Sequence, residues 1–246
     1  MLRLESCGCD RYLFFEELQR FPFIFHLFTV TPEQRVPERP HSRERLEQLL
    51  GCLGRPERLV FTRQVHGNQV HWFGRQKTIP QQGDGWLGDA PGALLLTQTA
   101  DCLPILLVDA KRRIVGNLHA GWRGTLAGIA GTAIRKLIDS GSRPEDLWMA
   151  LGPGIGNCCY EVGPEVLSAF EQQYPGAQAF FHPQPGSERK CLDLKGASTE
   201  QALNLGLRPE QILSNSFCTK CSADLFPSYR RDGIQAGRMF AVIGIQ

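Results

Sequence analysis

Apolar residues gather in short runs of strand length, separated by turns and by a few segments with helical spacing. Two aromatic-rich runs lie within residues 11–30. Further apolar runs cover residues 59–61, 69–73, 93–97, 105–108, 114–118, 147–151, 212–217 and 239–245. Such runs, bounded by Gly, Pro or Asn, are typical of strands. The chain is therefore expected to form a hairpin across the Gly67-Asn68 turn and another at Ala110-Lys111.

Four segments show the spacing of apolar positions that predicts helices. They are residues 42–50, capped by Ser42 and stopped by Gly51; 125–138; 164–173; and 197–205, stopped by Gly206. Residues 31–41 and 182–190 are rich in Pro and polar side chains, which indicates loops. Strands and helices mix without strict alternation, so we expect an α+β fold with mixed β-sheets flanked by helices. One domain over residues 1–246 accommodates this pattern.

Composition narrows the class of protein. The chain has 246 residues, 42% hydrophobic and 21% charged, with a net charge of +2 and no basic run that would form a nucleic-acid groove. Its apolar stretches are too short to cross a bilayer, and Met1–Glu5 does not begin a secretory signal. The nine cysteines cannot all pair with one another. We therefore expect a cytoplasmic protein with mostly free thiols and no membrane or nucleic-acid partner.

Three separated residues carry the strongest chemical signal: His66, Cys102 and His119. Two imidazoles and one thiolate suffice to hold a borderline-soft metal ion, and they leave a fourth position open, as catalytic zinc sites do. His119 lies at the end of a predicted strand, and Cys102 lies where Pro104 interrupts another. His71 is a competing ligand for His66, but it lies within a strand.

The neighbours of these residues add to the signal. Gly121-Trp122-Arg123-Gly124 follows His119, and its glycines and the start of a helix beside Arg123 form an anion-binding arrangement. Asp101, in an apolar region, needs a hydrogen-bonded partner or a ligand to orient. Arg230, in a paired-arginine turn, is a candidate for gathering a polar or anionic substrate.

Cys218-Thr219-Lys220-Cys221 is a CxxC pair, which can bind zinc or do redox work. No second pair lies at zinc-ribbon spacing, since Cys158 and Cys159 are adjacent. The pair also lacks the βαβ context of a thioredoxin. We interpret it as incidental.

Taken in order, the motifs resemble the signatures of the laccase-domain family, also called YfiH or "polyphenol oxidase". The matching segments are Gln64–Gly67, Thr99–Pro104, His119–Gly124, Gly152–Gly156 with Cys159–Gly163, and Ser228–Gly233 with Gly237-Arg238. They span roughly residues 59–246. The N-terminal segment 1–58 is atypical: no arginine and glycine pair follow His26-Leu27-Phe28, and Arg35 is the nearest substitute.

This resemblance implies a YfiH-like fold, also likened to that of toxin cysteine hydrolases, with zinc held by His66, Cys102 and His119. It implies phosphorolysis of adenosine, inosine, guanosine or methylthioadenosine, and deamination of adenosine. The small-molecule partners would then be a nucleoside and phosphate, with Arg123 and Arg230 as binding residues.

Several functions remain open from the residues. The first is a zinc-dependent phosphorylase or deaminase, in which the metal ligands His66, Cys102 and His119 are also the catalytic residues. The metal would polarise a group of the substrate or activate a bound water. A copper oxidase is a second hypothesis, because two His and one Cys also match a blue-copper set. However, the chain has six histidines and no His-x-His pair. A cysteine hydrolase with Cys102 as nucleophile and His119 as base is a third. The resemblance implies a fourth, a non-catalytic binding role or a role in editing peptidoglycan precursors.

Overall fold

The strands build three sheets in the computed structural model, which describes all residues except 9, 31–42, 56, 75–79 and 185–188. The first sheet has the order β1 (Leu2–Cys7), β2 (Asp10–Phe15), β3 (Ile24–Thr29), β15 (Met239–Ile245), β7 (Ala93–Thr99), β4 (Arg58–Val60). The second sheet has the order β14 (Ile212–Leu213), β10 (Leu147–Leu151), β8 (Leu103–Asp109), β9 (Ile114–Ala120), β6 (Gly85–Gly88), β5 (Val70–Phe73). A small third sheet contains β11 (Glu161–Val162), β13 (Lys190–Leu192) and β12 (Phe181–Pro183).

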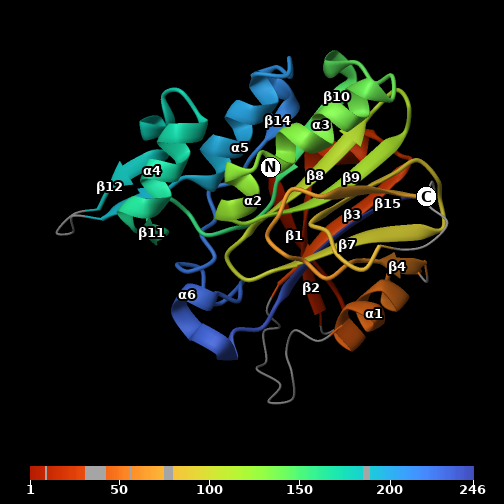
Figure 1. The fold of residues 1–246 in the computed structure, drawn as a ribbon. Helices are drawn as coiled ribbons and strands as arrows, with labels where there is room; N and C mark the ends of the chain where they lie inside the picture. Colours follow the sequence, from red (N-terminus) through yellow and green to blue (C-terminus); the bar gives the residue numbers. More distant parts are fainter. Residues whose placement is uncertain (9, 31–42, 56, 75–79, 185–188) are drawn as a thin grey trace.

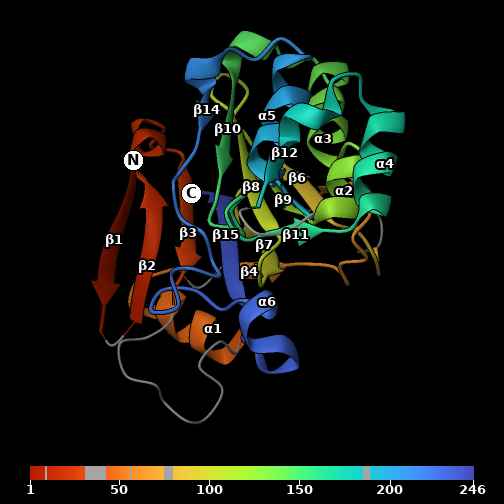
Figure 2. The same cartoon turned by 90° about the vertical axis from the view of Figure 1, so that its left-hand side faces the viewer.

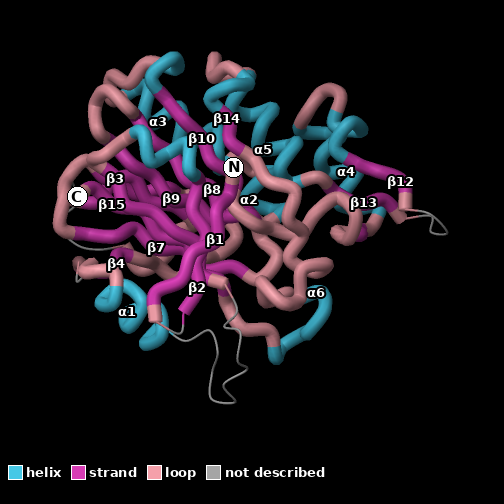
Figure 3. Tube along the Cα trace, turned by 180° about the vertical axis from the view of Figure 1, so that it is seen from behind, coloured by secondary structure: helices cyan, strands magenta, loops and turns pink. Residues whose placement is uncertain are grey.

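Helices cover the outer faces of the two large sheets: α1 (Arg43–Cys52) on the first, and α2 (Trp122–Leu126), α3 (Ile129–Asp139), α4 (Pro164–Gln173) and α5 (Leu194–Leu203) on the side of the second. The short helix α6 (Tyr229–Asp232) buries none of its residues. Figure 2 shows the first sheet on one side, the second sheet beside it, and α2 to α5 beyond the second sheet. Helix α1 lies apart from these, with the strands between, as the view from behind also shows (Figure 3).

The layers follow from strands that are buried on both faces. In β8, Leu106 and Val108 pack between the two large sheets, whereas Ile105 and Leu107 pack toward the helices. Successive side chains of a strand point to opposite faces of the sheet. A continuous apolar run therefore contributes side chains to the hydrophobic cores on both faces. Leu46, Leu49 and Leu50 of α1 complete a third core on the outer face of the first sheet.

The predicted α+β fold with mixed sheets is confirmed. Most pairings are antiparallel, but β4 with β7, β5 with β6, and β10 with β14 are parallel. The hairpin at Ala110-Lys111 joins β8 and β9 as expected. The hairpin predicted across Gly67-Asn68 is wrong, because β4 belongs to the first sheet and β5 to the second. The backbone N–H groups at residues 65–67 donate to Asp84 instead of closing a turn.

Several predicted boundaries also need correction. The helix expected over residues 125–138 is two helices, because Gly128 adopts a left-handed φ of 76° between α2 and α3. Pro104 does not interrupt a strand: it is the second residue of β8 and pairs with His119, near the strand's beginning, where proline is tolerated. Helix α1 continues past Gly51, and α5 begins at Leu194 because Asp193 caps it.

Other expectations differ at the ends of elements. The strand predicted over 212–217 is only β14, and parts of the predicted loop 182–190 belong to β12 and β13. Strand β1 was not predicted at all. The loop expected over 31–41 and the cap at Ser42 lie outside the described residues.

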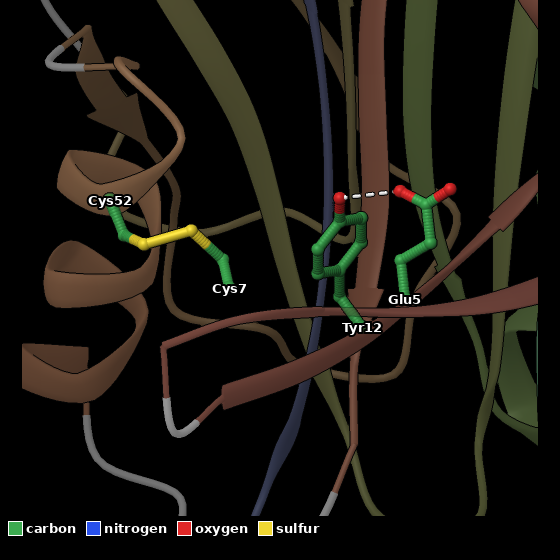
Figure 4. Close-up of a disulfide and its surroundings, with 4 residues drawn as sticks. All are labelled: Glu5, Cys7, Tyr12 and Cys52. Atoms are coloured by element: carbon green, nitrogen blue, oxygen red, sulfur yellow. Dashed lines mark hydrogen bonds between the residues drawn. A yellow bond between two sulfur atoms is a disulfide. The ribbon is translucent and has the colours of Figure 1, made fainter.

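A disulfide joins β1 to α1 through Cys7 and Cys52 (Figure 4). The same close-up shows the hydroxyl of Tyr12 donating to Glu5 on the neighbouring strand. The expectation of mostly free thiols is confirmed for six cysteines of the described chain and is wrong for this pair. The two cysteines lie 45 residues apart, so only the packing of α1 on the first sheet brings them together. None of the helices described is long and apolar enough to cross a membrane.

Candidate metal centre and substrate cavity

His66, Cys102 and His119 meet at one point, as expected from the sequence. One ligand atom from each lies within 4.8 Å of the others. His66 is in the loop after β4, Cys102 in the turn between β7 and β8, and His119 near the end of β9. The two imidazole rings meet edge to face, with their centroids 4.8 Å apart. Gly121 permits this approach, because a Cβ there would lie 2.9 Å from His66 and 3.0 Å from Cys102 Sγ.

Asp84 organises two of the three side chains. Its carboxylate lies 2.9 Å from Nδ1 of His119 and accepts the backbone N–H groups of His66 and Gly67, both at 2.8 Å. The side chain of Asp84 is completely buried. A carboxylate on Nδ1 leaves Nε2 of His119 to face the shared point, as in carboxylate–histidine–zinc arrangements.

The backbone is strained on both sides of the cluster. His66 has a φ of 60° and Asp101 a φ of 89°, in the left-handed region that non-glycine residues rarely occupy. Asp84 holds the first, and Asp101 is held by Thr219 Oγ1 at 2.6 Å and the backbone N–H of Arg230 at 2.7 Å. Strain of this kind persists only where the surroundings over-determine it, as at functional sites.

The charges of the cluster favour a thiolate. Burial by itself raises the pKa of the Cys102 thiol, but hydrogen bonds from His119 and His66 bring that pKa down to about 6. Burial by itself lowers the pKa of His119, but its hydrogen bonds to Asp84 and Cys102 raise that pKa to about 9. Burial raises and His119 lowers the pKa of Asp84, and the net shift is downward. A thiolate is the form of cysteine that binds metals or attacks electrophiles.

The donor set fits a metal ion. A tetrahedral zinc, with bonds of about 2.1 Å to nitrogen and about 2.3 Å to sulfur, separates its ligand atoms by about 3.4 to 3.8 Å. The three atoms here fall within 4.8 Å of one another, and a carboxylate orients one imidazole from behind. His66 is exposed while His119 is buried, so the cluster opens to solvent on one side.

A cavity of about 550 Å³ lies over that open side. Its wall combines the cluster with aromatic side chains (Trp122, Tyr160 and Tyr229) and guanidinium groups (Arg63, Arg123, Arg230 and Arg238). The guanidinium of Arg123 lies 4.2 Å from the ring centre of Trp122, and that of Arg230 lies 5.0 Å from that of Tyr160. Pockets of this volume take small organic ligands. The cations and rings suit an anionic, planar one.

The structure places Arg123 and Arg230 in the cavity, where the sequence had suggested them. The expected helix start beside Arg123 belongs to α2, which has only five residues. The anion-binding potential therefore rests on the arginines.

Asp101 is buried as expected, but its side chain orients none of the three clustered ligands. It accepts hydrogen bonds from Thr219 and Arg230 instead. His71 lies apart from the cluster, with Nε2 2.7 Å from the carbonyl oxygen of Gln82. Arg35 lies outside the described residues.

Sequence reasoning gave no role to Asp84 and missed Arg63. Asp84-Gly85 corresponds to an Asp-Ala pair of the laccase-domain family upstream of the cysteine, and Asp84 lies between two glycines directly before a strand. Arg63 gave no signal beyond its closeness to His66 in the sequence.

A second cavity, of about 630 Å³, lies between α1 and β4, where Arg43 pairs with Glu47 and Arg55 with Glu57. It is larger, but it holds none of the clustered His and Cys side chains.

Known proteins resemble the chain over most of its length. The purine nucleoside phosphorylase of Deinococcus radiodurans is 40% identical over 83% of this chain and 76% of its own. An adenosine deaminase, RL5, from an unknown prokaryotic organism is 34% identical over 75% of this chain and 74% of its own. The crystal structure of YlmD from Geobacillus stearothermophilus superposes with a TM-score of 0.83 and 29% identity, covering 98% of both chains.

The family described as multi-copper polyphenol oxidoreductase laccase matches residues 35–246. The match covers most of the chain, including His66, Cys102 and His119. The chain belongs to this family, and the resemblance seen in its motifs is confirmed.

Proposed function

We propose that this member of the laccase-domain family is a zinc-dependent purine nucleoside phosphorylase. The observation that carries the proposal is a single cavity that joins a His–Cys–His cluster to four arginines and three aromatic rings. The relative from Deinococcus radiodurans that bears this enzyme name supports it.

The three ligands we assign to the metal are His66, Cys102 and His119. A zinc ion held by them would supply a Lewis acid that polarises a group of the substrate. Among the described residues only two groups of His and Cys are close enough to bind a metal, and this is the one that contains histidine. A multicopper oxidase needs several histidine clusters, so the donor set favours zinc over copper despite the family's descriptive name.

The other side chains of the cavity have separate tasks in this proposal. Arg123, Arg63 and Arg238 bind the phosphate dianion, since guanidinium groups match its oxygens. Trp122 and Tyr160 pack against the purine. Burial raises the pKa of the Tyr160 phenol, so its hydroxyl stays protonated and can donate a hydrogen bond. In the reaction a phosphate oxygen forms a bond to C1′ of the ribose, and the bond from C1′ to the base breaks with its electron pair on the base.

The decisive measurement is the formation of ribose 1-phosphate and free base from adenosine and inosine by protein of known metal content. We expect product only when phosphate is present, and none from Cys102→Ala or His119→Ala, which lose metal and activity together. Phenol oxidation by copper-loaded protein without phosphorolysis would support the oxidase instead.

Arg123→Ala tests the phosphate site. The KM for phosphate is expected to rise about tenfold, because an exposed charge-assisted contact to a dianion is lost, while the KM for the nucleoside changes less. Arg20→Ala is a matched control: the Arg20 guanidinium also stacks on a tryptophan, Trp148, at 4.0 Å, but outside the cavity. Equal effects on both substrates would remove Arg123 from the phosphate site.

Deamination of adenosine is a second candidate function, favoured by the likeness to RL5. It differs from phosphorolysis in needing water rather than phosphate as co-substrate. Inosine and ammonia formed from adenosine in phosphate-free buffer would establish it. If neither forms in that buffer, while the same preparation forms ribose 1-phosphate once phosphate is added, deamination is excluded.

The lowered pKa of Cys102 is also compatible with a cysteine nucleophile. The two roles respond differently to a chelator. If the thiolate is a metal ligand, a chelator abolishes turnover and zinc restores it. Full turnover after complete metal removal, abolished in Cys102→Ala, would instead identify Cys102 as a nucleophile.

A further inference from the structure

Four cysteines gather outside the proposed active site. Cys158 and Cys159 lie in the loop after β10, and Cys218 and Cys221 lie in the CxxC turn after β14. Their sulfur atoms are all within 4.8 Å of one another. Sγ of Cys221 is 3.8 Å from that of Cys158 and 3.4 Å from that of Cys159, across 63 and 62 residues of sequence. The interpretation of the CxxC pair as incidental overlooked this partner pair, because adjacent cysteines do not match zinc-ribbon spacing.

The backbone around the cluster is built to approach sulfur. The N–H of Gly156 donates to Sγ of Cys218 at 3.2 Å. A Cβ on Gly156 would lie 3.2 Å from both Cys158 Sγ and Cys218 Cβ, so a larger residue would crowd the thiols. A β-bridge between Gly154 and Cys218 holds the two loops together. Backbone N–H groups that donate to sulfur favour the thiolate form, which is the form that binds metal.

Positive charge lies beside the cluster. The partly buried ammonium of Lys195 donates to the carbonyl oxygens of Asn215 and Phe217, on the segment that leads into Cys218. Arg231 donates to the carbonyl oxygens of Thr219 and Lys220, inside the CxxC turn. Four thiolates around a divalent cation carry a net charge of −2, which the ammonium of Lys195 would partly offset. The guanidinium of Arg231 is already paired with Asp232, so it contributes mainly by holding the CxxC turn.

We propose that Cys158, Cys159, Cys218 and Cys221 bind a second zinc ion, in a closed structural site. Four sulfur ligands at about 2.3 Å from zinc are about 3.8 Å apart in a tetrahedron, close to the separations in this cluster. Thiolates select zinc over hard cations, and a full set of four protein ligands leaves no position for substrate. This assignment does not rest on the function proposed for the cavity.

This second ion would brace the wall of the cavity. Tyr160, which lines the cavity, directly follows Cys159. Thr219, inside the CxxC turn, donates to Asp101, the neighbour of Cys102. Asp101 also accepts the N–H of Ile155 through its carbonyl oxygen. Joining the two loops through a metal would therefore hold Tyr160 and the Cys102 turn in place.

Elemental analysis of the full chain, purified with reductant from zinc-supplemented cells, tests the proposal. We expect about two zinc ions per chain in the wild type and about one in Cys158→Ser or Cys221→Ser. The matched control is Cys191→Ser, which changes a buried free cysteine outside the cluster and should keep both ions.

Cys102→Ser supplies a readout in a protein whose four-cysteine cluster is intact, in case the cluster variants fail to fold. It should retain one tightly held metal, and its cobalt-substituted form should keep the intense sulfur-to-cobalt charge-transfer bands of a four-thiolate site. A Cys102→Ser protein without metal would overturn the proposal. So would a wild type with a single zinc and a non-reducing peptide map that shows a Cys159–Cys221 disulfide.

Discussion

Asp84 is the residue through which the backbone and the metal ligands of the cluster are joined. One carboxylate satisfies three backbone N–H groups in residues 65–67 and contacts Nδ1 of His119. It thereby sets the strained conformation of His66 and the orientation of His119 together. Loss of such an outer carboxylate typically weakens metal binding without removing a ligand.

Asp84→Asn should lower zinc affinity by about ten- to a hundredfold, because the amide cannot orient His119 as a carboxylate does. Competition with a chromogenic chelator measures this. Asp109→Asn is a suitable control, since Asp109 is also fully buried and accepts backbone N–H groups, but in the β8–β9 hairpin. An unchanged zinc affinity in Asp84→Asn would mean that Asp84 is only a backbone cap.

The buried imidazole of His26 is expected to make the stability of the fold depend on pH. Burial lowers the pKa of this imidazole from 6.5 to about 4, and its Nε2 accepts the N–H of Phe15. Between these values the unfolded chain binds a proton that the folded chain does not. The free energy of unfolding should therefore fall by about 3 kcal/mol as pH drops from about 6.5 to about 4.

Denaturant unfolding of wild type and His26→Gln across that range isolates the effect. Glutamine keeps an acceptor for Phe15 but does not titrate, so the variant should show a shallower loss of stability on acidification. Parallel pH profiles for the two proteins would assign acid sensitivity to other groups.

At the scale of elements, the short helix α2 presses directly on the loop that carries His66. A Cβ on Gly124 would lie 2.8 Å from the carbonyl oxygen of Gly67 and 3.6 Å from that of His119. Both contacts are with backbone, which cannot move aside as a flexible side chain can. The position of α2 and the position of the metal ligands are therefore coupled.

Gly124→Ala should destabilise the fold by about 1 to 3 kcal/mol through overpacking, and should also weaken zinc binding because it displaces the His66 loop. Thermal unfolding and chelator competition report the two effects. Gly51→Ala, in α1 with nothing within 4 Å of its Cβ, should instead stabilise by about 0.5 to 1 kcal/mol. If Gly124→Ala bound zinc normally, the coupling would be disproved.

At the scale of the whole molecule, the two large sheets are joined by a buried polar contact as well as by apolar packing. Asn117 of β9, in the second sheet, is completely buried. Its amide donates to the carbonyl oxygens of Leu95 and Ala241 in the first sheet, and its carbonyl accepts from Thr97 Oγ1. Every hydrogen-bonding group of this side chain is thus satisfied across the interface between the sheets.

Asn117→Ala is expected to lower the free energy of unfolding by about 3 kcal/mol, because several buried partners lose their hydrogen bonds. Urea unfolding measures the change. Asn204→Ala removes an exposed amide that donates to its helix neighbour Glu200, and it should change stability by less than about 0.5 kcal/mol. A loss below about 1 kcal/mol in Asn117→Ala would show that apolar packing alone holds the sheets together.

The sequence by itself determined the local elements and the identity of the principal metal ligands. Apolar runs predicted β7 to β10 and β15 because strands buried on both faces need continuous apolar sequence. The motif-rich turns identified His66, Cys102 and His119 because their residue types and glycine neighbours are unusual for simple packing. These are properties of short segments, so local reasoning reaches them.

Only the tertiary structure decided which segments meet. Strands β4 and β5 belong to different sheets instead of pairing with each other, and this depends on long-range partners such as Asp84. The strained backbone at His66 depends on the same partners. The Cys7–Cys52 disulfide and the gathering of Cys158 and Cys159 with the CxxC turn have the same origin. Each joins segments separated by tens of residues, and the physical reason is that such contacts arise from the packing of whole layers, which no local periodicity encodes.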